Sequence, residues 1–140
     1  MQAIRKFCDF YQQLNVRDVS GLSNVYANDI EFIDPIGKHN GIAELTDYFN
    51  ALLSGTRSCE FDIDSVDAID EQKYVVTWQM RFESTALKTP TPISVDGISI
   101  IKTNDSHVTY HRDYYDVGQM AYEHVPILGY WVRKIKRRLQ

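Results

Sequence analysis

The stretch YVVTWQMRFE, residues 74–83, alternates apolar and polar side chains along its length. A period of two is typical of a β-strand with one buried face. The face predicted to be buried carries Tyr74, Val76, Trp78, Met80 and Phe82. The opposite face carries Thr77, Gln79, Arg81 and Glu83. A strand of this length needs paired neighbours, so the alternation predicts a sheet.

Further strands are predicted on both sides of this stretch. Residues 59–63 alternate before it, and residues 93–102 and 108–116 follow it. We expect a loop at residues 88–92, which contain two prolines, and a turn at residues 104–106. The region from residue 58 onward therefore predicts an antiparallel meander.

The residues before the sheet follow the helical period instead. A first helix at residues 3–14 has one apolar face, made of Ile4, Phe7, Cys8, Tyr11 and Leu14. Asp18 is a candidate N-cap for a short second helix, which we expect to bury Val19, Leu22 and Tyr26. A third helix begins at residue 42 and ends at Gly55. Helices followed by an antiparallel sheet indicate an α+β domain whose helices cover one face of the sheet.

Length and cysteine content narrow the class of protein. The chain has 140 residues, and we expect residues 1–140 to form one domain. Its two cysteines, Cys8 and Cys59, form no CxxC motif, which suits a reducing compartment. The first residues lack a signal-type apolar core, and no stretch of about 18 apolar residues exists. We therefore expect a cytoplasmic protein.

The charge of the chain is uneven. Its formal net charge is −4, yet residues 133–138 hold five basic side chains and no acidic one. The preceding residues hold 10 basic and 19 acidic side chains, which argues against nucleic-acid binding. Residues 126–139 predict a basic amphipathic helix, with an apolar face made of Leu128, Trp131, Ile135 and Leu139. We favour packing of this helix on the acidic body, and the alternative is peripheral membrane contact with anionic lipid.

Two motifs resemble a known superfamily. The stretch YANDIEFIDPIG, residues 26–37, is followed by Gly41 and a helix. It resembles the front half of the ketosteroid isomerase and SnoaL-like branch of the nuclear transport factor 2 superfamily. The stretch HRDYYD, residues 111–116, resembles the last strand of those proteins, especially that of limonene epoxide hydrolases. The resemblance implies a cone-shaped α+β domain with N-terminal helices on a strongly curved, mostly antiparallel sheet and a C-terminal helix. Since this superfamily includes isomerases, cyclases, hydrolases and non-catalytic binders, the fold does not fix the function.

Asp34 is the first candidate for chemistry. It precedes Pro35 in a predicted turn in which Gly37 permits a positive φ. The resemblance implies a general base that moves a proton beside a carbonyl. The alternative is an aspartate that only caps the turn by accepting backbone hydrogen bonds.

The last strand holds the second candidate. Alternation places His111, Asp113 and Tyr115 on one face and Arg112 on the other. The resemblance puts the first set in the pocket and matches Asp113 to the aspartate of the epoxide hydrolase motif. A histidine beside a carboxylate is an acid–base pair that works near neutral pH. The alternative is that His111 and Asp113 only satisfy one another and buried tyrosines.

The chain departs from both enzyme types. Aligned without a gap, the oxyanion tyrosine of the isomerases falls at Phe10, and Tyr11 beside it points about 100° away on a helix. Their second tyrosine falls at Phe49, and their protonated aspartic acid falls near Ser99. An enolate would lack its donors, so we do not expect steroid-type isomerisation. The Arg-x-Asp of the epoxide hydrolases is replaced by Trp-Gln-Met at residues 78–80, so their relay is incomplete.

The prediction is therefore an enzyme of isomerase, cyclase or hydrolase type that uses cofactor-free acid–base chemistry on a hydrophobic small molecule. Its predicted catalytic groups are Asp34, His111 and Asp113. Its predicted pocket wall contains Tyr26, Phe10, Phe49, Trp78, Met80 and Tyr115. No motif indicates a metal site, a nucleotide cofactor or a nucleophile.

Two other functions remain open from the sequence. One is a non-catalytic module that binds a lipid or metabolite, and the other is a dimeric scaffold. We also expect a homodimer through the outer face of the sheet, which carries Tyr110, Arg112 and Tyr114. Interface cores favour tyrosine and arginine.

Overall fold

The computed structural model describes residues 1–140 except 86–91 and 122–125. The predicted loop at residues 88–92 therefore lies almost wholly outside the described residues. The described helices are α1 (Gln2–Gln12), α2 (Leu22–Val25), α3 (Ile42–Ser54), α4 (Val117–Met120) and α5 (Pro126–Arg138). The described strands are β1 (Tyr26–Ile33), β2 (Lys38–Asn40), β3 (Thr56–Asp70), β4 (Lys73–Ser84), β5 (Ile93–Thr103) and β6 (Val108–Tyr115).

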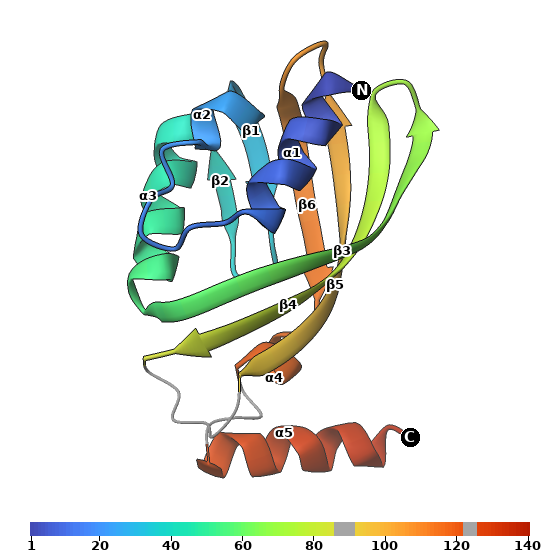
Figure 1. The fold of residues 1–140 in the computed structure, drawn as a ribbon. Coiled ribbons are helices and arrows are strands. Elements are labelled where there is room, and N and C mark those ends of the chain that lie inside the picture. Colours follow the sequence, from blue (N-terminus) through green and yellow to red (C-terminus); the bar gives the residue numbers. More distant parts are fainter. Residues whose placement is uncertain (86–91, 122–125) are drawn as a thin grey trace.

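The strands form one six-stranded sheet in the order β2-β1-β6-β5-β4-β3. Strands β3 to β6 pair antiparallel in chain order, and β1 lies parallel to β6. The antiparallel meander predicted from residue 58 onward is confirmed. Figure 1 shows the sheet curving around α1, α2 and α3, with α4 and α5 near the start of β5. The predicted α+β class, with helices on a curved and mostly antiparallel sheet, is confirmed.

The long strands bend because their register is interrupted. The pairing of β3 with β4 shifts between Ile63 and Ser65 and again between Ala68 and Asp70. An extra residue at such a bulge bends the strand and increases its twist. The inner face of the sheet consequently wraps around α1 and α3, and its side chains converge on one interior space.

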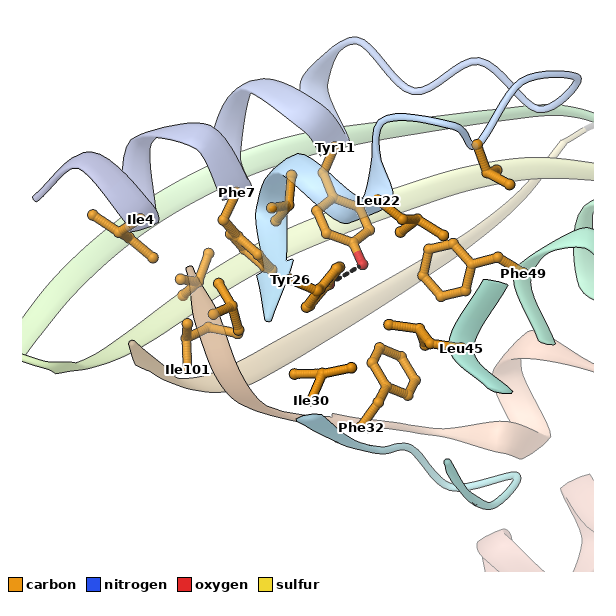
Figure 2. Close-up of a cluster of buried hydrophobic side chains, with 14 of the residues drawn as sticks. Ile4, Phe7, Tyr11, Leu22, Tyr26, Ile30, Phe32, Leu45, Phe49 and Ile101 are labelled. Atoms are coloured by element: carbon orange, nitrogen blue, oxygen red, sulfur yellow. Dashed lines mark hydrogen bonds between the residues drawn. The ribbon is translucent and has the colours of Figure 1, made fainter. Parts of the chain in front are cut away.

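The interior of the curved sheet holds the hydrophobic core. Figure 2 shows side chains from α1, α3 and the strands meeting there. The most buried members include Leu22, Tyr26, Ile30, Phe32, Leu45, Val76, Ile101 and Val108. The predicted apolar face of the first helix is confirmed for Ile4, Phe7 and Tyr11, which are buried. Cys8 is only partly buried, at the edge of the same cluster.

Three local predictions are wrong. The second helix begins at Leu22, because Asp18 caps a turn before it instead of the helix itself. Tyr26, expected on that helix, is the first residue of β1 and is buried in the core. The positive φ lies at Gly41, where it is 88°, and not at Gly37.

Gly97 on β5 is a contact point where the fold leaves no room for a side chain. It pairs with Trp78 on β4, and a Cβ built on Gly97 would lie 2.2 Å from the indole ring. That ring is 6% exposed and is fixed by Phe61, whose ring centre lies 5.4 Å away. The absence of a side chain at position 97 therefore lets Trp78 lie flat on β5.

We expect Gly97→Ala to lower the free energy of unfolding by about 1–3 kcal/mol, the usual cost of overpacking. Urea unfolding measures this loss, and near-ultraviolet circular dichroism reports the displacement of Trp78. Gly55→Ala is the matched control, because its Cβ would approach no atom closer than 3.9 Å. Equal stability of the two variants would contradict the proposed contact.

The outer face of the sheet carries aromatic and basic side chains in adjacent rows. Tyr114 is 44% exposed and lies opposite Ile98, which is 37% exposed. The guanidinium of Arg112 lies 4.9 Å from the ring centre of Tyr114, and Lys102 lies 4.9 Å from that of Tyr110. This composition matches the core of a protein interface.

We expect a two-fold homodimer through this outer face. Tyr114→Glu should shift the protein toward monomer, because like charges from the two copies would meet across the axis. Sedimentation equilibrium measures the mass, and Tyr130→Glu on α5 is a control at a tyrosine that is also exposed. A monomer mass that Tyr114→Glu leaves unchanged would contradict the dimer.

Candidate functional site

An apolar cavity of about 100 Å³ lies between the inner face of the sheet and helices α1 and α3. Its apolar and aromatic wall consists of Phe7, Tyr11, Phe32, Tyr48, Phe49, Leu52, Phe61, Ile63, Val76, Trp78, Met80, Tyr115 and Met120. Its remaining polar residues are Asp34, Ser99, His111 and Asp113. Among the described residues no lysine or arginine lines this space. The two carboxylates therefore lie in apolar surroundings without a neighbouring cation in the wall.

Strand β6 supplies three of these residues through its alternation. His111, Asp113 and Tyr115 face the cavity. Arg112 points to the outer face, where its guanidinium lies over the ring of Tyr114. This is the arrangement predicted from the period of the strand.

His111 is the centre of a buried hydrogen-bond chain. It is 2% exposed and packs against Phe32, with ring centres 4.6 Å apart. Its Nδ1 lies 2.7 Å from the hydroxyl of Tyr26, which lies 2.6 Å from the hydroxyl of Tyr11. Figure 2 shows the contact between the two tyrosines. On its other side, Nε2 lies 2.6 Å from Oδ1 of Asp113.

A second chain reaches the same carboxylate oxygen from β4 and β5. The indole N–H of Trp78 donates to Oγ of Ser99 at 2.8 Å. Ser99 in turn donates to Oδ1 of Asp113 at 2.5 Å, and the two residues pair directly between β5 and β6. Oδ1 of Asp113 is thus the end point of both chains.

Donor and acceptor chemistry connects these bonds. Burial raises the pKa of Tyr11 and of Tyr26 well above the ordinary value, so both keep their protons. In the Nε2–H tautomer of His111, Nε2 donates to an ionised Asp113 and Nδ1 accepts from Tyr26. The two tyrosines, His111 and Ser99 thus form one connected network that ends at Asp113.

The second oxygen of Asp113 remains for a ligand. Both hydrogen bonds of this carboxylate among the described residues go to Oδ1. The side chain is 15% exposed. Ser99 and His111 therefore fix the carboxylate through Oδ1, and Oδ2 is left as an acceptor in an apolar cavity. A general base requires this arrangement.

Asp34 is more fully engaged. Its Oδ1 accepts from the backbone N–H groups of Ile36 and Gly37 at 2.9 and 3.0 Å. Its Oδ2 accepts from the hydroxyl of Tyr48 at 2.5 Å. Asp34 caps the turn, which is the second of the two interpretations open from the sequence, and it also lines the cavity. Asp34 thus accepts three hydrogen bonds on two oxygens, whereas Asp113 accepts two on one oxygen. Asp113 therefore has more acceptor capacity left for a ligand.

Tyr115 brings a donor to the cavity. Its hydroxyl makes no hydrogen bond with any described residue, and its ring lies 6.2 Å from that of Trp78. Burial, followed by the charges of Asp34 and Asp113, raises its pKa above the ordinary value. Tyr115 is therefore a protonated hydroxyl that can donate to a bound molecule.

Tyr26→Phe should destabilise the protein by about 1–3 kcal/mol, because it leaves the buried Nδ1 of His111 without a donor. Tyr11→Phe should cost less, about 0.5–1.5 kcal/mol, because Tyr26 can still donate to His111. Urea unfolding of both variants checks the order. A greater loss for Tyr11→Phe would contradict the central place of Tyr26 between Tyr11 and His111.

Comparison with known proteins places the chain in a family. The sequence profile of the SnoaL-like domain matches residues 7–111, which include the second half of α1, the Asp34 turn and the first residue of the His111 motif. The chain belongs to the SnoaL-like family. No curated protein is similar enough in sequence to match.

Solved structures similar to this SnoaL-like domain have low sequence identity. A putative polyketide cyclase from Acidithiobacillus ferrooxidans is 16% identical, with a TM-score of 0.73, covering 89% of this chain and 94% of its own. An epoxide hydrolase of the limonene type from M. tuberculosis is 17% identical, with a TM-score of 0.71 and coverages of 95% and 96%. TerC, crystallised with polyporic acid, is 16% identical, with a TM-score of 0.70 and coverages of 84% and 93%. At these identities the similarity shows the fold alone.

The cavity of this SnoaL-like domain contains most of the residues predicted for it. The structure brings together Asp34, His111, Asp113, Phe49, Trp78, Met80 and Tyr115. Phe10 is a correction, because it faces Gly21 beneath a separate hollow on the outside of α1. Tyr26 is the other correction, because its ring stacks behind His111 and does not reach the cavity.

Three polar residues of the cavity were not predicted as site residues. Tyr11 takes the place expected for Phe10, since the rotation of α1 turns residue 11 inward. Tyr48 lies on α3 beside the predicted Phe49, and both reach the cavity. Ser99 had one sequence signal, the alignment that put the protonated aspartic acid of the isomerases near it, and the structure pairs it with Asp113. The described residues contain no group of histidine, cysteine and acidic side chains that could hold a metal ion.

Proposed function

We propose that this SnoaL-like protein is a cofactor-free enzyme that removes a proton from a small, largely apolar molecule. The observation that supports this is Oδ2 of Asp113, an acceptor held in an apolar cavity by bonds to the other oxygen. Asp113 is the proposed base. His111 and Ser99 are positioning residues that orient the carboxylate.

Tyr115 is the proposed donor to the negative charge that develops on the substrate. When a C–H bond beside a carbonyl loses its proton, the electron pair moves to the carbonyl oxygen, which then needs a hydrogen-bond donor. Tyr115 keeps its proton and has no other hydrogen-bond partner among the described residues. Asp34 and Tyr48 form a second polar pair in the wall, which is proposed to orient the substrate.

The cavity limits the size of the substrate. It measures about 100 Å³, which is smaller than the roughly 150 Å³ of a cavity that holds benzene, so the enclosed space does not contain a whole ring. Its wall is mainly aromatic, and Leu52, which is 49% exposed, lies at its edge. We therefore propose a substrate whose reacting part enters the cavity while the remainder of its ring system extends past Leu52. A polyketide-like or other cyclic carbonyl compound fits this description.

The test uses a generic proton-abstraction substrate, 5-nitrobenzisoxazole. A base removes its C–H proton, the N–O bond breaks, and the released phenolate is measured by absorbance. The proposal predicts turnover above that of acetate buffer, and competition by phenols that enter the cavity. Absence of turnover, together with tight binding of the same phenols, would favour a non-catalytic binding module.

A further inference from the structure

The C-terminal helix α5 exposes most of its apolar side chains. Leu128, Trp131 and Ile135 are 45%, 52% and 57% exposed, and Leu139 just beyond the helix is 83% exposed. We expected this face to pack on the acidic body of the protein. The structure corrects this expectation, because α5 contacts α4 through a different face.

That contact face is narrow. A Cβ on Gly118 of α4 would lie 3.2 Å from Val132 and 3.4 Å from Nζ of Lys136. Lys136 also forms an ion pair with Asp116, the N-cap of α4. With about 100° per residue, the four exposed apolar residues fall within an arc of about 80° beside this contact face. The contact with α4 thus holds the helix while its apolar stripe stays open.

Basic residues border the apolar stripe on both sides. Lys136, which also pairs with Asp116, flanks it on one side and Arg138 flanks it on the other, and α5 contains no acidic residue. Three further cations, Arg133, Lys134 and Arg137, lie on the remaining surface of the helix. The ammonium of Lys134 lies 5.1 Å from the ring centre of Trp131. The charge of the helix is therefore opposite to that of the rest of the chain.

We propose that α5 binds the surface of an anionic lipid bilayer and lies in the plane of the interface. An apolar stripe that contains tryptophan and has cations on its flanks matches such helices, which insert the stripe and pair the cations with lipid phosphates. None of the described helices is long and apolar enough to cross a membrane, so the contact is peripheral.

A second copy of the chain fits the stripe less well. Among the described residues, the exposed large apolar side chains outside the C-terminal helix and Leu139 are Met1, Ile36, Leu52, Val66, Ile69, Ile98 and Tyr114. They come from separate elements, so they offer no continuous groove along the length of α5. The acidic body can attract the cations, but a lipid surface accommodates both the cations and the stripe.

Trp131 provides the signal for a direct test. The chain has two tryptophans, and Trp78 is buried at 6% exposure, so a change in emission on adding vesicles reports Trp131. The probes are vesicles of phosphatidylcholine with and without phosphatidylserine. We expect a blue shift and co-sedimentation only with phosphatidylserine, both reduced by high salt.

Ile135→Gln separates insertion of the stripe from attraction of charge, because it leaves the charge unchanged. It should weaken binding by about tenfold or more, given the apolar area removed. Tyr130→Gln is the matched control, since Tyr130 is similarly exposed but lies on the opposite side of the helix. It should bind within about twofold of the unchanged protein, because it removes no part of the stripe.

Several results would overturn the proposal. Equal binding by Ile135→Gln and the unchanged protein would indicate a purely electrostatic contact. The same blue shift with heparin in place of vesicles would indicate a general site for polyanions. A concentration-dependent blue shift without lipid would assign the stripe to a second copy of the chain. No binding to the phosphatidylserine vesicles would reject the proposal directly, whatever the outcome of the proton-abstraction assay.

Discussion

Asp113→Asn is expected to lower turnover of a proton-abstraction substrate by about 10²–10⁴-fold, the usual contribution of a positioned general base. In the variant, either the NH2 group or the uncharged oxygen of the amide occupies the position of Oδ2. Neither of these groups binds a proton strongly. The shape of the side chain is retained, and its oxygen can still accept from Ser99 and His111. The loss should therefore appear in kcat, with the fold unchanged by circular dichroism.

The matched control is Asp96→Asn. Asp96 is an exposed aspartate on β5 that bonds to Gln79 and does not line the cavity. It should leave turnover within about twofold, as surface substitutions usually do. Asp34→Asn provides a second comparison, because it removes one negative charge from the cavity and leaves Oδ2 of Asp113 in place. If Asp34→Asn abolished turnover while Asp113→Asn retained it, the base would be Asp34.

His111→Phe addresses the positioning role in the same assay. The change removes the donor to Oδ1 of Asp113 and breaks the chain to Tyr26.

A ligand-binding module would keep its affinity for a phenol after Asp113→Asn, whereas an enzyme loses turnover and keeps binding. Measuring both the turnover and the affinity for the phenol therefore separates an enzyme from a binding module.

The sequence predicted the features of the fold that depend on period. Alternation on the last strand placed His111 and Asp113 on one face and Arg112 on the other, because side chains on a strand can only point to two sides. The helical period likewise predicted the buried face of α1. These patterns are local, and each one is set by a single element.

The sequence could not predict the features that depend on contacts between elements. Phe10 and Tyr11 are adjacent and both aromatic, so only the rotation of α1 against the sheet shows that Tyr11 faces the cavity. The bond from Tyr48 to Asp34 joins a helix to a turn. The chain from Tyr26 to Asp113 needs the parallel pairing of β1 with β6, which hydropathy does not indicate.

Stability should fall steeply at alkaline pH because of the tyrosines in the site. Burial raises the pKa of Tyr11 and Tyr26 well above the ordinary value, so they stay protonated in the folded state. In the unfolded chain they ionise above about pH 10. Above that pH the folded state binds more protons than the unfolded state, so each tyrosine lowers the free energy of unfolding by about 1.4 kcal/mol per pH unit. Their contribution is complete below about pH 10 and is lost as the pH rises toward the folded pKa.

The contribution of one tyrosine can be isolated with Tyr11→Phe. Other groups also titrate at alkaline pH, and the effects of those that do not interact with Tyr11 cancel when the variant is compared with the unchanged protein. We expect the gap in free energy of unfolding between the two proteins to be constant below about pH 10 and to narrow by about 1.4 kcal/mol per pH unit well above it. Tyr114→Phe is the control, because Tyr114 is 44% exposed on the outer face of the sheet. A gap that stays constant through the alkaline range for Tyr11→Phe would mean that Tyr11 ionises as freely in the folded protein as in the unfolded chain. In that case neither the burial of Tyr11 nor its contact with Tyr26 would hold its hydroxyl protonated.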